Sequence, residues 1–225
     1  MLRADLLSAV SGLAHGFTAD RRLSFSADPD DPALGELARR AEVTPGRFAL
    51  ARQVHGRDVL RVDAPGFAGD ADALITGAED VYLTIRTADC VPILLLGADR
   101  ELAAVHAGWR GTAADIVAAT VAAMHAPPRA AVIGPCISAA AYEVGEEVVE
   151  GIAASGVPVE VFVRRDMGDR PHVDLRAAVA WQLHRCGVTA VSILPQCTVG
   201  DPRLHSYRRD RGESGRMVSF IGWRP

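Results

Sequence analysis

Short apolar runs crowd the middle of the chain and constrain its fold more than any other feature. Residues 81–87, 93–97 and 102–106 are rich in Val, Ile and Leu and are bounded by Gly, Asp or Pro, which is typical of strands. No helical segment separates these runs, so strict β-α alternation is absent. The sequence therefore predicts an α+β fold of mixed β-sheets flanked by outer helices, rather than a doubly wound parallel sheet.

The rest of the sequence predicts further strands and four helices. Further strands are predicted over residues 57–62, 131–134, 159–164, 188–194 and 217–223. Helices are predicted over residues 31–42, 112–125, 145–155 and 174–186, the first from an Asp-Pro start and the last from an Asp start and a Gly187 stop. With 225 residues, 49% of them hydrophobic, we expect a single compact domain over 1–225.

Composition excludes several classes of protein. The net charge of −4 gives no basic field for nucleic acid, and no apolar run approaches the roughly 18 residues of a membrane span. No signal peptide is recognisable at the N-terminus, so we expect a soluble cytoplasmic protein. The four cysteines are widely spaced without a CxxC pair, and we interpret them as reduced thiols or metal ligands.

The chain contains no lysine, so all 24 of its basic residues are arginines. Schiff-base, pyridoxal-phosphate and P-loop mechanisms need a lysine and are therefore excluded. Any anion that this protein binds must be held by arginine or by backbone N–H groups.

Three metal-capable residues, His55, Cys90 and His106, each lie at the end of an apolar run. Side chains at strand ends can converge at one edge of a sheet, and two imidazoles with one thiolate suit zinc, while copper is possible. Three protein ligands would leave the fourth position open, as in a catalytic site. Two alternatives stay open: an ordinary packed histidine and cysteine, or a Cys90 nucleophile with His106 as its base.

Two arginine-containing segments are candidate anion sites. Arg110 precedes a predicted helix in the segment HAGWRGT, where backbone N–H groups and the guanidinium could bind phosphate; the alternative is an ordinary strand–turn–helix joint capped by Thr112. A second cluster, in a segment resembling a ligand loop, contains Arg208, Arg209 and Arg216.

Cys136 follows a strand in the segment GPCI. A nucleobase-deaminase zinc site would need HxE followed by PCxxC, and both the HxE and the second cysteine are missing. We therefore predict that Cys136 is a packed core residue.

Several motifs together resemble the bacterial laccase-domain family, also described as zinc-dependent purine nucleoside phosphorylases or peptidoglycan editing factors. The matching segments are QVHG at 53–56, DADALIT at 70–76, TADCVPILL at 87–95, HAGWRGT at 106–112, GPCI at 134–137, AYEVG at 141–145, CT at 197–198, and SYRRD with GR at 206–216. HAGWRGT together with TADC, in that order, is a specific signal.

The resemblance implies that zinc is bound by His55, Cys90 and His106, which would also be the catalytic residues. It implies phosphorolysis of adenosine, inosine, guanosine and methylthioadenosine, with adenosine deamination, so that purine nucleosides and phosphate are the ligands. Under this hypothesis Arg110, Arg208 and Arg209 contact phosphate or ribose. Residues 1–50 diverge from the family, because HGFTADRRLSFSADPDDP lacks the family's Arg-Gly-Gly-Val-Ser and Asn-Leu elements.

Three other functions stay open at the level of sequence. An amide hydrolase acting on peptidoglycan precursors would use a Cys90 nucleophile or a metal-bound water. A copper-dependent polyphenol oxidase fits poorly, because the chain has 7 histidines and no HxH pair. A non-catalytic zinc-binding protein would need a fourth ligand, for which Cys136 and His172 are candidates.

Overall fold

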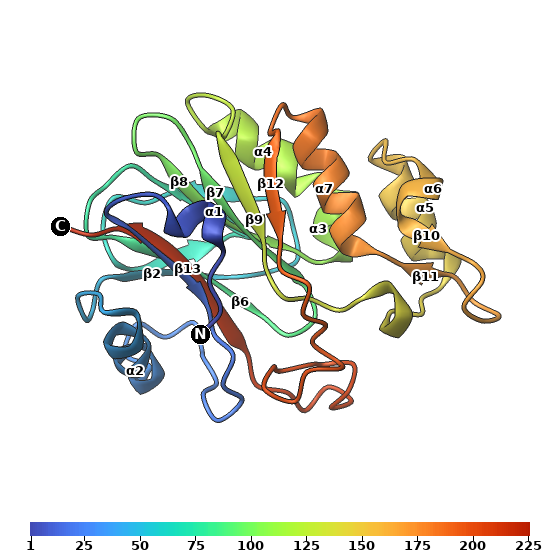
Figure 1. The fold of residues 1–225 in the computed structure, drawn as a ribbon, viewed down its shortest axis with the longest axis horizontal. Helices are drawn as coiled ribbons and strands as arrows, with labels where there is room; N and C mark the ends of the chain where they lie inside the picture. The colour runs from blue at the N-terminus through green and yellow to red at the C-terminus, as the bar shows by residue number, and fades with distance from the viewer.

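Two mixed sheets lie face to face between outer helices in the computed structural model, which describes residues 1–225 (Figure 1). The first sheet has the strand order β1 (Leu13–Phe17), β13 (Met217–Trp223), β6 (Tyr82–Thr87), β2 (Phe48–Arg52) and β4 (Gly66–Asp70). The second has the order β12 (Ala190–Ile193), β9 (Ala130–Ile133), β7 (Val91–Leu96), β8 (Leu102–Ala107), β5 (Ala73–Thr76) and β3 (Val59–Arg61). The predicted α+β class and single compact domain are confirmed.

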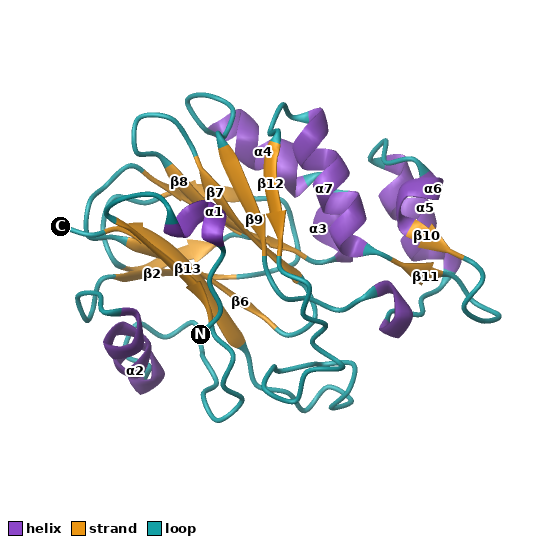
Figure 2. Ribbon diagram, in the orientation of Figure 1, coloured by secondary structure: helices purple, strands orange, loops and turns teal.

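Helices cover both outer faces, as Figure 2 shows. The helices are α1 (Asp5–Ser8), α2 (Pro32–Ala41), α3 (Trp109–Ala113), α4 (Ile116–Ala123), α5 (Glu146–Ala154), α6 (Val159–Phe162) and α7 (Leu175–Arg185), with a 3₁₀ turn at Ala139–Ala141. Strands β10 (Val163–Arg164) and β11 (His172–Val173) pair beside α5 and α6. None of these helices combines the length and the apolar character needed to cross a bilayer.

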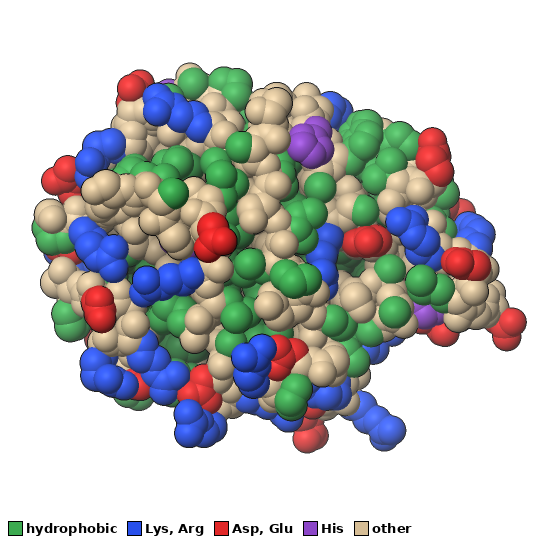
Figure 3. All heavy atoms as spheres, viewed as in Figure 1, with side chains coloured by type: hydrophobic (Ala, Val, Ile, Leu, Met, Phe, Trp, Pro, Cys, Tyr) green, Lys and Arg blue, Asp and Glu red, His purple; other side chains and the backbone are tan.

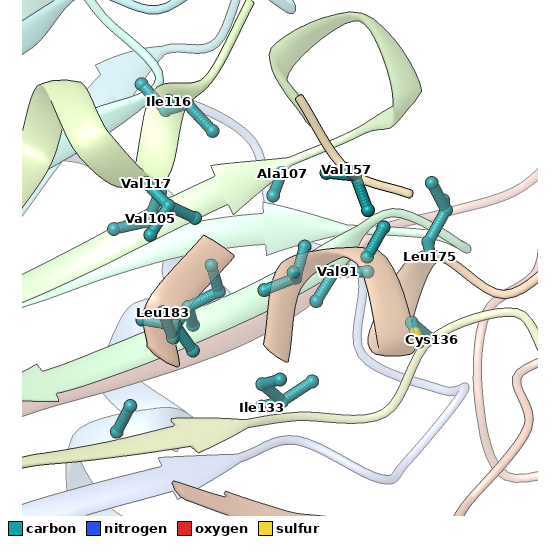
Figure 4. Packing of buried hydrophobic residues seen from close by; sticks show 14 of the residues in the cluster. Val91, Val105, Ala107, Ile116, Val117, Ile133, Cys136, Val157, Leu175 and Leu183 are labelled. Atoms are coloured by element: carbon teal, nitrogen blue, oxygen red, sulfur yellow. The ribbon is translucent and has the colours of Figure 1, made fainter. Parts of the chain in front are cut away.

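Alternation along the strands divides the core into layers. Ile93 and Leu95 of β7 face the cluster under the helices, whereas Leu94 between them faces the other sheet, as the two-residue period of a strand requires. The helix-side cluster includes Cys136, which is fully buried near Ile133 and Leu175 (Figure 4), so its predicted packing role is confirmed. On the face seen in Figure 3, acidic and basic side chains are interspersed.

Two predicted elements were wrong in part. The helix expected over 112–125 begins earlier and breaks into α3 and α4 at Asp115, which has a left-handed φ of 59° and pairs with Arg185 of α7. Thr112 lies inside α3 and donates its hydroxyl to the Gly108 carbonyl oxygen, so it does not cap a helix. The strand expected over 159–164 is instead a helical turn over Val159–Phe162, directly after Pro158, and only its last two residues, Val163 and Arg164, are extended.

Candidate functional site

The three predicted metal-capable side chains meet at one point of the molecule. The ligand atoms of His55, Cys90 and His106 all lie within 4.8 Å of one another, and the two imidazole rings are 4.8 Å apart at their centroids. His55 is exposed, Cys90 is half-buried and His106 is buried. The group is therefore open to solvent on one side and anchored in protein on the other.

Strand register explains why two of these residues meet. In the antiparallel pair β7–β8, Val91 is opposite Ala107 and Pro92 is opposite His106. Cys90, which directly precedes β7, therefore lies beside the end of β8. His55 comes from the turn after β2, in the other sheet, and adopts a left-handed φ of 60°.

Asp72 hydrogen-bonds to the His106 ring and to the His55 backbone, and the sequence did not indicate it as a site residue. Its carboxylate is fully buried and accepts the Nδ1–H of His106 at 2.7 Å. It also accepts the backbone N–H groups of Val54, His55 and Gly56, at 3.2, 3.0 and 2.7 Å respectively. This one carboxylate therefore fixes the His55 turn and orients the His106 ring so that Nε2 faces Cys90.

The Cys90 thiol and the His106 imidazole influence each other's protonation. Burial opposes a charged thiolate, but the positive charge of His106 and hydrogen bonds from His106 and His55 lower the Cys90 pKa to about 6. Burial likewise disfavours a charged His106, but the Cys90 charge and the bond to Asp72 raise its pKa to about 9. Without metal, the site favours a thiolate beside an imidazolium.

The donor set fits a metal such as zinc. A thiolate and two imidazoles are its preferred ligands, and an Asp hydrogen-bonded to the remote nitrogen of a ligating His is the usual support for such a site. Neither proposed fourth ligand belongs to the group: Cys136 is contacted at its sulfur by Arg176, and His172 bonds to the Ala139 carbonyl oxygen. The arrangement therefore leaves one coordination position for a reactant.

A cavity of about 630 Å³ opens over this group. Its wall contains polar, aromatic and cationic side chains, namely Gln53, Arg86, Thr87, Asp89, Trp109, Arg110, Tyr142, Tyr207, Arg208 and Arg216, besides the metal-capable residues. Pockets of this size accept a drug-sized or nucleoside-sized molecule. Of these residues, Arg110 and Arg208 were predicted to contact substrate, whereas Arg86, Gln53 and Tyr142 were not.

The predicted arginines occupy different environments. Arg110 is exposed and stacks over Trp109 at 4.3 Å. Arg208 lies 5.3 Å over the Tyr142 ring and donates to the Glu143 carbonyl oxygen. Arg209 is absent from the cavity wall; its guanidinium donates to carbonyl oxygens within its own loop, of Thr198, Val199, Asp201 and Leu204.

Asp89 joins the metal-site segment to the C-terminal loop. One carboxylate oxygen accepts the Thr198 hydroxyl, and the other accepts the Arg208 backbone N–H at 2.7 Å. Its left-handed φ of 88° is uncommon for a residue with a side chain. These bonds place Arg208 at the cavity.

The chain is similar to known proteins over most of its length. The family model described as "Multi-copper polyphenol oxidoreductase laccase" matches residues 33–224. A Deinococcus radiodurans protein named purine nucleoside phosphorylase is 38% identical over 222 residues, covering 94% of this chain and 85% of that protein. A Streptomyces coelicolor protein of the same name is 38% identical over 239 residues, covering 94% and 96%.

Solved structures give the same result for the fold. The crystal structure of YlmD from Geobacillus stearothermophilus superposes with a TM-score of 0.83 at 27% identity and covers 99% of this chain and 94% of that chain. A Neisseria meningitidis protein, NMB0706, superposes with a TM-score of 0.80 at 29% identity, with 96% of each chain covered. The resemblance inferred from the motifs is confirmed.

Proposed function

The chain belongs to the multi-copper polyphenol oxidoreductase laccase family, and from this premise we propose that it is a purine nucleoside phosphorylase with a single zinc site. Two relatives at 38% identity carry that name. The observation that carries the proposal is the shared location of an open His-Cys-His group and a cavity lined by arginines and aromatic rings. A nucleoside needs the aromatic surface, and phosphate needs the cations.

The proposed reaction exchanges one bond for another. The bond between C1′ and the purine nitrogen breaks, a bond from C1′ to a phosphate oxygen forms, and the proton of hydrogen phosphate goes to the departing purine. The products are the free base and ribose 1-phosphate, or 5-methylthioribose 1-phosphate where methylthioadenosine is the substrate. We propose adenosine, inosine, guanosine and methylthioadenosine as substrates.

His55, Cys90 and His106 would hold the zinc, with Asp72 orienting His106 and the His55 turn. When bound, zinc would supply a Lewis acid at the open side of the group. The chain's own side chains position the reactants: Trp109, Tyr142 and Tyr207 offer aromatic faces for the base, and Arg110 and Arg208 offer cations for ribose or phosphate.

We propose adenosine deamination as a second reaction of the same site. Water would replace the exocyclic amine of adenosine and release ammonia, giving inosine. The same open metal position and cavity would serve this reaction. Since all four cysteines are free, we also propose that the protein works in a reducing compartment such as the cytoplasm.

The test follows products of adenosine with the purified protein. We expect adenine and ribose 1-phosphate only when phosphate is present, and inosine with or without phosphate; a chelator should abolish both. Cys186→Ser is the matched control for Cys90→Ser, because both thiols are half-buried and only Cys90 is in the metal group. Absence of adenine formation by the metal-loaded protein would refute phosphorolysis.

A second candidate function has one specific observation in its favour. Cys90, His106 and Asp72 form a thiolate–imidazole–carboxylate series, as in cysteine hydrolases. An amide hydrolase acting on peptidoglycan precursors would use Cys90 as nucleophile. Amide hydrolysis that survives metal removal, and that Cys90→Ser abolishes, would favour this function over phosphorolysis.

A further inference from the structure

Two arginines on the cavity wall, Arg86 and Arg216, share a feature that neither the motifs nor the metal group explains. Both are half-buried, both line the cavity, and neither forms an ion pair with a carboxylate. Most of their N–H donors are free, since Arg86 makes one long bond of 3.3 Å to the Ala51 oxygen and Arg216 donates through Nη1 to Ser214 and Gly215 oxygens.

Strand register brings the two side chains to one place. Strands β6 and β13 are antiparallel, with Arg86 opposite Val218. Arg216 precedes Val218 by two residues, so it is the diagonal neighbour of Arg86 on the same face of the sheet. Burial and the positive charge of Arg216 both lower the pKa of Arg86, which is the expected effect of two cations held close together.

The backbone of each arginine is fixed before any ligand arrives. The Gln53 side chain bonds both the N–H and the carbonyl oxygen of Arg86, at 2.9 and 2.7 Å. The Arg216 N–H donates to the Ser24 hydroxyl at 3.1 Å, and its carbonyl oxygen accepts the Phe25 N–H at 3.2 Å. Ser24 and Phe25, in the N-terminal part of the chain, therefore support one half of the pair.

The pair is distinct from the arginines near the metal group. Arg110 lies over the Trp109 ring at 4.3 Å and Arg208 over the Tyr142 ring at 5.3 Å, whereas Arg86 lies on β6 and Arg216 directly precedes β13, in the first sheet. Asp31 is not within ion-pair distance of Arg86 and is committed to Ser26 and Ala33 N–H groups. The cavity thus has two separate cationic groups.

We propose that Arg86 and Arg216 form the phosphate subsite of the cavity, and that Arg110 and Arg208 contact the nucleoside. Two guanidinium groups suit a phosphate dianion because each offers parallel N–H donors. An anion between them also removes their mutual repulsion. The identity of the anion as co-substrate rests on the proposed phosphorolysis; the existence of the subsite does not.

The test measures binding of inorganic phosphate directly by calorimetry, in the metal-loaded protein and without nucleoside. We expect Arg86→Gln and Arg216→Gln each to raise the phosphate Kd by about 10- to 100-fold, the loss of a charge-assisted contact. Arg110→Gln should change it by less than about threefold, on the same scale. Arg129→Gln is the matched control, because Arg129 is exposed and absent from the cavity. Thermal melting of each variant separates lost binding from lost folding.

Adenosine 5′-monophosphate provides the second arm, since its phosphoryl group has the same chemistry. Phosphate binding that both Arg86→Gln and Arg216→Gln weaken supports the subsite, even if the protein releases no adenine, in which case only the proposed function fails. Binding unchanged in both folded variants, or absent at millimolar phosphate in the wild type, overturns it. If the two substitutions weaken binding of the monophosphate but not of inorganic phosphate, the subsite does not bind free phosphate.

Discussion

Replacing Asp72 with Asn is the sharpest test of how this site is built. The buried carboxylate accepts four N–H groups, two on each oxygen: His55 and His106 on one, Val54 and Gly56 on the other. A carboxamide nitrogen accepts none. Whichever way the Asn amide is turned, two of the four bonds are therefore lost and two donors are left without a partner.

The magnitude follows from those two donors. Each buried group left without a partner costs about 1–3 kcal/mol, so the free energy of unfolding of the metal-free protein should fall by about 2–6 kcal/mol. Loss of the carboxylate that supports a ligating histidine should weaken zinc binding by about 10- to 100-fold. Urea denaturation measures the first effect, and competition with a chromogenic chelator measures the second.

Asp70→Asn is the matched control, two residues away. Asp70 is exposed and pairs only with Arg52 at the surface, so its loss should cost no more than about 1 kcal/mol and leave zinc binding unchanged. If Asp72→Asn retains zinc affinity within about twofold of the wild type, rather than the 10-fold or greater loss expected, Asp72 does not orient the ligands and this account of the site is wrong.

Three other residues give independent predictions. Burial and nearby Arg3 and Arg224 lower the pKa of His15 to about 4 from 6.5, so the unfolded chain takes up a proton first as pH falls. The free energy of unfolding should therefore drop by up to about 3 kcal/mol between pH 7 and pH 4. Urea denaturation at several pH values measures this drop, and an equal drop in His15→Gln and in the wild type would contradict the prediction. A Cβ on Gly108 would lie 3.0 Å from the Cys90 sulfur, so Gly108→Ala should weaken zinc binding several-fold, measured by chelator competition; unchanged affinity would mean that the sulfur can move away freely. Arg209→Gln should lower the free energy of unfolding by about 2–4 kcal/mol through lost bonds to loop carbonyls and leave the phosphate Kd of the folded protein unchanged, and a raised Kd would return Arg209 to the binding site.

Local sequence predicted the elements well where the signal is local. The helix over 31–42 and the strand over 102–106 correspond closely to α2 and β8, because a cap and a short apolar run are sufficient signals there. The break at Asp115 depends on Arg185, 70 residues further along the chain. An Ala-rich run gives no local sign of such a contact.

The site residues likewise differ in whether a local sequence signal indicates them. Cys90 and His106 come from strands that are neighbours in sequence, and their convergence follows from antiparallel pairing. Asp72 could not be distinguished from Asp70, because the chain leaves the first sheet at β4 and enters the second at β5 between them. That change of sheet buries one carboxylate and exposes the other.

Adjacent arginines illustrate the limit most directly. Arg208 and Arg209 are identical in chemistry and neighbours in the chain. The Arg208 backbone bond to Asp89 places its side chain at the cavity, whereas Arg209 turns into its own loop. Only the path of the loop, set by a residue more than a hundred positions earlier, separates a candidate ligand contact from a structural residue.

The family description names several copper ions, yet this chain assembles one ligand group. His55, Cys90 and His106 are its only cluster of three or more metal-capable side chains. The five remaining histidines are outside this group, and each has a backbone group or a carboxylate as its partner: His15, His125, His172, His184 and His205. A multi-copper centre needs several such groups close together, so the protein should bind one divalent ion per chain at saturation. Elemental analysis after loading with zinc or with copper measures this ratio, and two or more tightly held copper ions per chain would refute the reasoning.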